Sequence, residues 1–378
     1  MAIDYIEILD KDRKLIGIID TAKSIIWKSE YYGTGDFEIY VSATPKIVAL
    51  IRDGQYAARP NDVNVGVIED VEITYSARDG RMILVSGRFA KSILGRRLIY
   101  KLGVSGASIE PVISSGLVEV AVRKLVQTQI ISPDLPARKI SFIGLGPIKD
   151  IPQKIVDADG EAARKQTSYA NLLTYTDELL QEYGLGAYMS LDRGSGTLLY
   201  NVFAGKDRSV GNADGNKPII FSQAFDNLLS STYKHQTETY KNMALIGGEG
   251  EGIDRVIAYV GESMAGMDRR EVWVDASGQS RTYTDEDTGE ETTYFLWEYV
   301  PLLQAAGRQQ LEQLKEINTF DGEVDVSRIG LEYGTEYWIG DIVTRQDDDL
   351  GISANARIVS VIETQDESGY NISISFGI

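Results

Sequence analysis

The chain has 378 residues, of which 43% are hydrophobic and 25% charged, and it contains no cysteine. This composition indicates a folded protein with room for two or three domains, and it excludes disulfide scaffolds and thiolate metal sites. With 38 basic and 56 acidic residues the net charge is −18, so the protein as a whole repels nucleic acid.

The N-terminal region carries Asp4, Glu7 and Asp10, which does not fit the basic and then apolar plan of a signal peptide. No apolar run approaches the ~20 residues needed to span a bilayer, so we expect no stable membrane insertion. The single histidine, His235, excludes a histidine-rich zinc site.

Alternating apolar residues predict a series of short strands in the first quarter of the chain, at 3–9, 15–19, 24–28, 36–41, 56–59, 65–75 and 82–86. One helix interrupts them, with Thr44 as its N-cap, Pro45 at its first position and Gly54 at its end. Such a run of strands with one small helix predicts a β-barrel domain over residues 1–95.

From about residue 88 the apolar period becomes helical. Helices are expected at 88–97, at 117–131 and, after Ser168 as N-cap, at 169–183. A loop-rich stretch at 132–166 separates the last two, and a hairpin at 187–191 and 197–203 follows. Residues 96–217 therefore form an inserted α+β module.

The last part of the chain returns to strands, at 228–235, 271–274, 316–326, 336–345, 355–364 and 370–376. It also holds a helix at 301–315 and a polar loop at 278–293. We interpret residues 218–378 as a second β-barrel domain. The expected fold class is thus mainly β, with two related barrels and a smaller α+β insertion.

The stretch 242–260 is rich in glycine, with Gly247, Gly248, Gly250 and Gly252 between two apolar runs. A glycine-rich loop after a strand can hold a phosphate, but Glu249 and Glu251 would repel one and no Lys-Ser/Thr pair follows. The pattern favours a structural hairpin.

The sequence offers only weak candidates for a catalytic or metal-binding site. The acidic loop Asp285–Glu291 offers oxygen ligands for calcium, but it departs from the EF-hand pattern, and a solvated charged loop is favoured. Ser195 would need His235 as its base, a contact that nothing in the sequence supports, and no two carboxylates are marked as a glycosidase pair. We therefore expect no catalytic centre, no metal and no cofactor.

The motifs and their order resemble the baseplate-hub, or tail-associated (Tal-like), proteins of long-tailed bacteriophages and their prophage relatives. The features that carry the resemblance are Gly35-Asp36-Phe37-Glu38-Ile39, Gly66-Val67-Ile68-Glu69-Asp70, Arg96-Arg97, residues 242–255 with Gly-Gly-Glu-Gly, Arg270-Glu271, and Gly340-Asp341-Ile342-Val343-Thr344. They span nearly the whole chain.

This resemblance implies a structural virion protein at the tail tip, assembled in the bacterial cytoplasm. Such hubs are homotrimers whose six tube-type barrels form a ring that continues and closes the tail tube. The implied partners are distal tail, tape-measure, tail-tube and receptor-binding proteins, with phage DNA passing through during ejection without specific binding. Because the chain ends at Ile378, directly after the last expected strand, a lytic domain is not expected.

Seven residues are candidates for interfaces between subunits or for the lumen of the ring: Arg96, Arg97, Glu249, Glu251, Arg255, Asp285 and Asp287. Two alternatives remain open. One is a tail-tip enzyme that degrades cell-wall or capsule glycan with carboxylates. The other is a carbohydrate-binding module in which tyrosines and Trp273, Trp297 or Trp338 stack on sugars.

Overall fold

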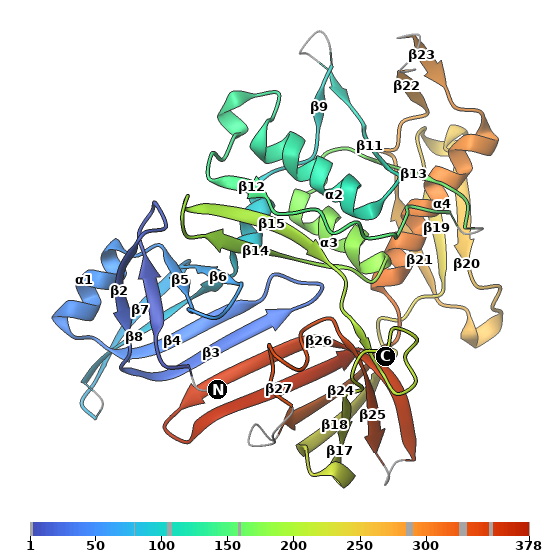
Figure 1. Ribbon diagram of the computed structural model, residues 1–378. Helices are drawn as coiled ribbons and strands as arrows, with labels where there is room; N and C mark the ends of the chain where they lie inside the picture. The colour runs from blue at the N-terminus through green and yellow to red at the C-terminus, as the bar shows by residue number, and fades with distance from the viewer. Residues whose placement is uncertain are drawn as a thin grey trace.

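The computed structural model describes residues 3–78, 80–103, 108–157, 160–284, 290–324, 331–347 and 351–377 (Figure 1). Strands dominate this part of the chain, so the prediction of a mainly β protein is confirmed. None of its helices is long and apolar enough to cross a membrane.

One large sheet contains strands from both ends of the chain, in the main order β18-β24-β27-β26-β3-β4-β8-β7. The N-terminal strands are β3 (Ala22–Glu30), β4 (Asp36–Ser42), β7 (Asp70–Ser76) and β8 (Gly80–Arg88). The C-terminal strands are β18 (Leu228–Gln236), β24 (Ile317–Val324), β26 (Ile352–Asp366) and β27 (Gly369–Gly377).

The two ends of the chain meet where β26 pairs with β3, antiparallel from Ser360 with Glu30 to Gln365 with Ile25. Before an irregularity between Ile358 and Ser360, the same edge of β26 pairs with β25 (Ile342–Asp347). Two short strands, β16 (Asp207–Arg208) and β17 (Ile220–Ser222), pair with β25 in parallel. The strand β26 therefore links both halves of the sheet.

A second sheet, with the order β2-β1-β5-β6, lies against the N-terminal half of the large one. Its strands are β1 (Ile6–Leu9), β2 (Leu15–Ile19), β5 (Tyr56–Ala58) and β6 (Val65–Val67). Buried side chains from both sheets, among them Ile8, Trp27 and Phe37, form a common core. The helix α1 (Pro45–Asp53) begins as predicted, because the Thr44 side chain accepts a hydrogen bond from the backbone N–H of Ile47.

The chain crosses from one sheet to the other between β6 and β7. The backbone N–H of Ile68 donates to Gln55, and that of Glu69 donates to Ser86 on β8. At the opposite side β2 and β3 are not paired, so the strand pairings in the described part of the chain close no barrel. The two-barrel interpretation therefore remains a prediction.

The inserted module contains two helices, α2 (Val118–Val126), which continues as a wider turn over Gln127–Ile131, and α3 (Leu172–Glu182). Its sheet has the order β12-β15-β14. The strands are β12 (Ile143–Leu145), β14 (Gly186–Asp192) and β15 (Thr197–Phe203), with the smaller pairs β9 (Lys101–Leu102) with β10 (Ile109–Glu110) and β11 (Val112–Ser115) with β13 (Arg164–Thr167). Its core also includes Leu9, Tyr56 and Val67 from the second sheet.

Two of the helices predicted in this module differ in the structure, one in its type and one in its first residue. The segment expected at 88–97 is a 3-10 helix over Ala90–Arg96. The helix α3 is capped by Asn171, whose side chain accepts from the backbone N–H groups of Leu173 and Thr174, and not by Ser168. Tyr169, between the two, has a φ of 63°, so the chain turns before the helix can begin.

A smaller α/β unit lies between β18 and β24, which pair with each other. Its strands are β19 (Met243–Gly247), β20 (Ile257–Gly261) and β21 (Glu271–Asp275), with β20 antiparallel and β21 parallel to β19. The predicted hairpin at 242–260 is thus confirmed, although it belongs to this three-stranded sheet and not to the large one.

The helix α4 (Leu296–Gln313) covers one face of the three-stranded sheet. It begins earlier than the predicted residue 301 and includes Pro301, because the Glu298 side chain accepts from the backbone N–H of Phe295 and fixes the first turn there. The polar loop predicted at 278–293 contains the hairpin β22 (Thr282–Thr284) and β23 (Glu291–Thr293). Four further 3-10 turns lie at Pro136–Arg138, Gln223–Phe225, Gly252–Asp254 and Gly266–Asp268.

Candidate functional site

The described residues offer little that could perform chemistry. They contain no group of three His, Asp or Glu side chains that could hold a metal ion. The Ser195 hydroxyl donates to Asp192 Oδ2 at 2.6 Å, inside the turn between β14 and β15, and this hydrogen bond lowers the pKa of Asp192. His235 lies on a different element, β18, opposite Asn318 of β24. Asp285 and Asp287 of the predicted acidic loop lie outside the described residues.

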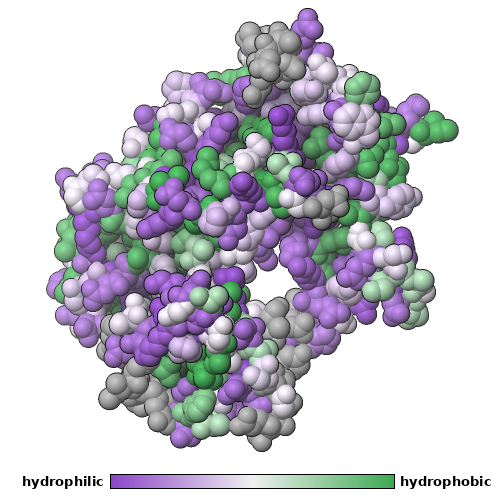
Figure 2. Space-filling model, turned by 45° about the vertical axis from the view of Figure 1, so that its right-hand side comes forward, coloured by the Kyte–Doolittle hydropathy of each residue, from purple (hydrophilic) through white to green (hydrophobic). Residues whose placement is uncertain are grey.

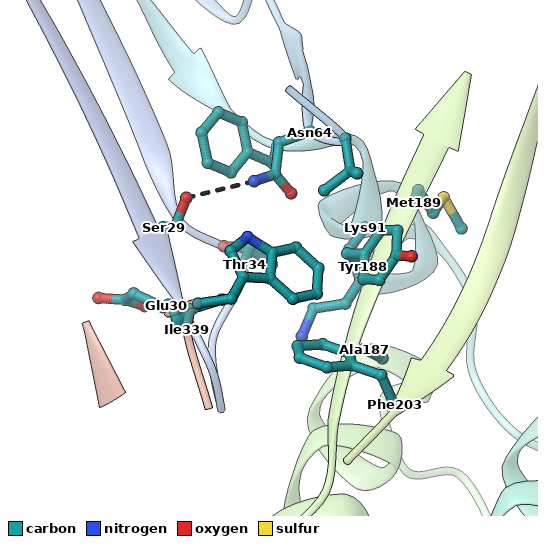
Figure 3. A pocket seen from close by; sticks show the side chains of 13 residues that line it. Ser29, Glu30, Thr34, Asn64, Lys91, Ala187, Tyr188, Met189, Phe203 and Ile339 are labelled. Carbon is teal, nitrogen blue, oxygen red and sulfur yellow. Dashed lines mark hydrogen bonds between the residues drawn. The ribbon is translucent and has the colours of Figure 1, made fainter. Parts of the chain in front are cut away.

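A small cavity lies where the N-terminal strands, the inserted module and residues 338–339 meet (Figure 3). Its volume is about 20 Å³, which is room for a single water molecule and not for a substrate. Asn64 Nδ2 donates to Ser29 Oγ across one wall at 3.2 Å. The opposite wall is formed by Lys91, Tyr188 and Phe203. This cavity is a packing defect at a junction of three parts.

Next to this junction, Lys91 is buried at 2% exposure and its Nζ lies 2.9 Å from Asp177 Oδ1 on α3. Burial raises the pKa of Asp177, and the Lys91 ammonium opposes that rise. The pair connects the 3-10 helix at 90–96 to α3. Because both charges are inside the protein and hydrogen-bonded to each other, we assign them a structural role.

A second buried network joins the two β-rich ends of the chain. Arg59, just after β5, makes two parallel hydrogen bonds to Glu363 on β26, with Nη1–Oε2 and Nη2–Oε1 distances of 2.7 and 3.0 Å. The Tyr370 hydroxyl donates to the same carboxylate at 2.6 Å, and Asp62 lies 3.5 Å from Arg59. Burial and the neighbouring Glu363 carboxylate raise the pKa of Tyr370.

The strand β7 ends the large sheet, and all seven of its residues are exposed. Val71, Ile73 and Tyr75 lie on the face that carries the core on neighbouring strands, yet they are 40%, 55% and 74% exposed. An edge strand that presents apolar side chains and unpaired backbone groups is a template for pairing with another chain. The open edge of β7 is therefore a candidate surface for contact with another protein chain.

A second open edge lies on β2, the end strand of the four-stranded sheet. Leu15, Ile16 and Ile18 are 55%, 41% and 36% exposed. The turn before this strand, Asp10–Lys14, holds three basic and two acidic residues, whereas β7 carries Asp70 and Glu72. Both open edges are thus apolar in part.

The outer face of the large sheet, away from the core, is polar and rich in carboxylates on its N-terminal strands. The pairings bring Glu38 of β4 and Asp70 of β7 into one row through Ser86. Glu72 of β7 and Asp36 of β4 point to the same side. Lys28 lies 2.5 Å from Glu30 and 3.9 Å from Asp36, and partial burial raises the pKa of Asp36.

The sequence-derived candidates are distributed over two places. Arg96 is exposed on the inserted module, whereas the Arg97 Nε donates to the backbone carbonyl of Arg138 at 2.9 Å. The other described candidates, Glu249, Glu251 and Arg255, lie together in the loop between β19 and β20.

In that loop the Glu249 backbone N–H donates to the Tyr299 hydroxyl of α4 at 2.9 Å, and its Oε2 accepts from the backbone N–H of Arg281 at 2.6 Å. Glu251 is exposed. Arg255 Nε donates to the carbonyl of Gly250 at 3.2 Å. An interface or lumen role for these residues and for the two arginines stays a prediction.

Sequence reasoning missed both the Arg59–Glu363 network and the exposure of β7. The alternation of Val71, Ile73 and Tyr75 with polar residues does indicate a strand. It cannot tell whether the apolar side meets a core of the same chain or a partner. For the ion pair no local pattern exists, since its members are 304 residues apart.

The architecture is that of phage tail proteins. The 43 kDa tail protein of prophage MuSo2 from Shewanella oneidensis matches with a TM-score of 0.55 at 15% identity, over 98% of this chain and 98% of that one. The tail protein from Neisseria meningitidis MC58 matches with a TM-score of 0.53 at 14% identity, over 99% of this chain and 96% of that one. The comparison with curated proteins found no match.

The model of the siphovirus ReqiPepy6 Gp37-like protein family matches residues 5–378, and the chain belongs to this family. The resemblance to phage tail proteins that the order of motifs indicated is thereby confirmed.

Proposed function

We propose that this protein is the hub at the tip of a phage tail. Three copies form a ring that continues and closes the tail tube and that joins it to distal tail, tape-measure, tail-tube and receptor-binding proteins. In this assignment residues 1–95 and 218–378 supply the two tube-type parts of each subunit, and residues 96–217 form the insertion between them. The protein acts structurally and not as an enzyme.

The observation that carries this proposal is the single sheet that runs through both ends of the chain with one polar face. A ring of three such sheets would present six strand-rich halves around a central channel. The carboxylates of Asp36, Glu38, Asp70 and Glu72 on that face suit a channel through which DNA passes, because like charges keep the polyanion from adhering.

The two open edges support a closed ring. An interface made from two different surfaces of one subunit joins copies head to tail, and it closes when the rotation per copy permits. The two open apolar edges, on β7 and on β2, are such a pair of different surfaces. Arg96 and the charged residues of the β19–β20 loop, Glu249, Glu251 and Arg255, are further candidates for contacts with neighbouring proteins, as are Asp285 and Asp287.

The first test is the mass of the assembly in solution. The wild-type chain is expected to elute at three times its own mass in light scattering. Ile73→Lys places a charge in the apolar contact of β7, so it is expected to shift the population to monomers. Because Ile73 is already 55% exposed, its circular dichroism and melting temperature should stay close to wild type.

Thr74→Lys is the matched control, since it introduces the same lysine side chain on the opposite face of the same strand. It is expected to leave the trimer intact. A wild-type chain that remains monomeric at high concentration and is absent from the tail tip in immunogold images would refute the proposal.

A further inference from the structure

The three-stranded sheet of the small α/β unit has one covered and one open face. Ala244, Ile246 and Ala258 point towards α4 and are at most 3% exposed. On the other face the register places Tyr259 of β20, Leu245 of β19 and Trp273 of β21 in one row. Tyr259 is 60% and Trp273 47% exposed. In Figure 2 an opening separates this unit from the lower part of the molecule.

The two aromatic residues in this row are separated by one strand. Neighbouring strands lie ~4.8 Å apart, so the Tyr259 and Trp273 backbones are ~10 Å apart across β19. An extended β-1,4-linked glycan presents the same side of every second sugar at a similar repeat. The Trp273 ring leans from β21 over Gly247 of β19, and with Tyr259 on β20 it forms one strip on which sugars of a single chain can stack.

The Trp273 ring is held in place by its neighbours. A Cβ added to Gly247 would lie 2.4 Å from Trp273 Cη2, so the ring lies directly against the glycine backbone. The Arg255 guanidinium is 5.7 Å from the ring centre. Glycine at position 247 thus allows the ring to lie on the sheet, and the arginine restricts its movement.

Two similar turns place charged groups on either side of this ring. Gly252-Ile253-Asp254-Arg255 and Gly266-Met267-Asp268-Arg269 are both 3-10 turns that end in an arginine. Arg255 lies 3.6 Å from Asp275, and Arg269 lies 2.6 Å from Glu271.

Glu271 and Asp275 lie two residues before and two residues after Trp273 on β21, so they share its face of the sheet. Their side chains are 62% and 58% exposed, so each carboxylate, which has one oxygen in the ion pair with its arginine, also presents its second oxygen as an acceptor for a sugar hydroxyl.

We propose that this face, the Tyr259–Trp273 platform, binds an extended β-1,4-linked glycan such as a cell-wall polysaccharide. The rings stack on two sugars of one chain, and the arginine–carboxylate pairs at both ends bind hydroxyl or acetamido groups. This inference does not depend on the hub assignment.

The size of the face argues for a glycan over a second protein copy. Three strands of five residues cover ~17 Å by ~14 Å, or ~240 Å², whereas a stable protein interface buries ~800 Å² on each partner.

The other two tryptophans considered for sugar binding from the sequence lie elsewhere in the structure. Trp338 packs against Phe203 and Tyr188, and Trp297 stacks on Phe295 at the start of α4.

The test is a titration of the full-length protein with chitohexaose, a soluble β-1,4-linked hexasaccharide, followed by tryptophan fluorescence and calorimetry. The wild type is expected to bind. Trp273→Ala and Tyr259→Ala are each expected to weaken binding about tenfold or more, because each removes one stacking ring. Trp297→Ala, which changes an exposed tryptophan off the platform (73% exposed), is the matched control and should change the affinity less than twofold.

A second variant tests the geometry of the ring. Gly247→Ala keeps every side chain of the platform but displaces Trp273, so it too should weaken binding, with circular dichroism confirming the fold. If the wild type binds neither chitohexaose nor cellohexaose nor soluble peptidoglycan strands, the proposal is wrong. It is also wrong if Trp273→Ala binds as well as Trp297→Ala, or if the platform variants alter only the mass of the assembly.

Discussion

Arg59 and Glu363 form the clearest single contact between the two ends of the chain. Their side chains are 15% and 4% exposed, and the Tyr370 hydroxyl satisfies a further lone pair of the carboxylate. Glu363→Ala would leave the guanidinium buried without its main partner. We expect a loss of about 3–5 kcal/mol in the free energy of unfolding, measured by denaturant titration.

The control for this change is Glu69→Ala. Glu69 makes an equally short bidentate pair with Arg88, but Arg88 is 52% exposed. Water therefore replaces the lost partner, and the expected cost is below about 1 kcal/mol. Equal losses for the two variants would show that burial does not determine the strength of these pairs in this protein.

At the scale of single elements, helix starts illustrate what local sequence can and cannot determine. Thr44-Pro45 predicted the start of α1 correctly because the cap and the first helical residue are adjacent. For α3 two capping residues, Ser168 and Asn171, stand within four positions of each other. The positive φ of Tyr169 decides between them, and it depends on contacts such as the backbone hydrogen bond from Tyr169 to Ile99, which no local pattern reveals.

This choice of cap can be measured. Asn171→Ala removes the acceptor for two N–H groups and the hydrogen bond from Asn171 Nδ2 to the Gly95 carbonyl. We expect a loss of about 1 kcal/mol in the free energy of unfolding. Ser168→Ala should cost no more than a few tenths of that. The reverse order would mean that the helix begins at the position first predicted from sequence.

The strand β7 shows a second limit of sequence patterns. The stretch 65–75 was expected to form one strand, but it divides into β6 (Val65–Val67), in the second sheet, and β7 (Asp70–Ser76), in the large one. In β7 the apolar residues of the alternation are exposed. Because apolar alternation is identical for a core and for an interface, only the arrangement of neighbouring strands distinguishes the two.

At the scale of the whole molecule, the small α/β unit and the N-terminal part should differ in autonomy. Residues 237–316 have their own core and their strands pair only among themselves in the described part of the chain. Expressed alone, this fragment is expected to unfold cooperatively and to give dispersed amide resonances. Residues 1–95 alone are expected not to fold, since β3 would lose β26 and the second sheet would lose the inserted module.

Circular dichroism melts and two-dimensional NMR spectra of the two fragments check this expectation. A folded 1–95 fragment would instead support the sequence-based division into independent barrels. That division rested on the local apolar periodicity along the chain. Pairing between strands more than 300 residues apart, as between Trp27 and Glu363, cannot be predicted from local sequence patterns.

The pairing of β3 with β26 also determines how the molecule carries mechanical load. The two strands run antiparallel over the pairs from Ile25–Gln365 to Glu30–Ser360. A force that pulls the two ends of the sheet apart along the strand direction acts on all of these backbone hydrogen bonds at once, in shear. A force across the strands would open them one after another, as in a zipper. The junction is therefore strongest against tension along the strands, and weakest against bending of one half of the sheet away from the other.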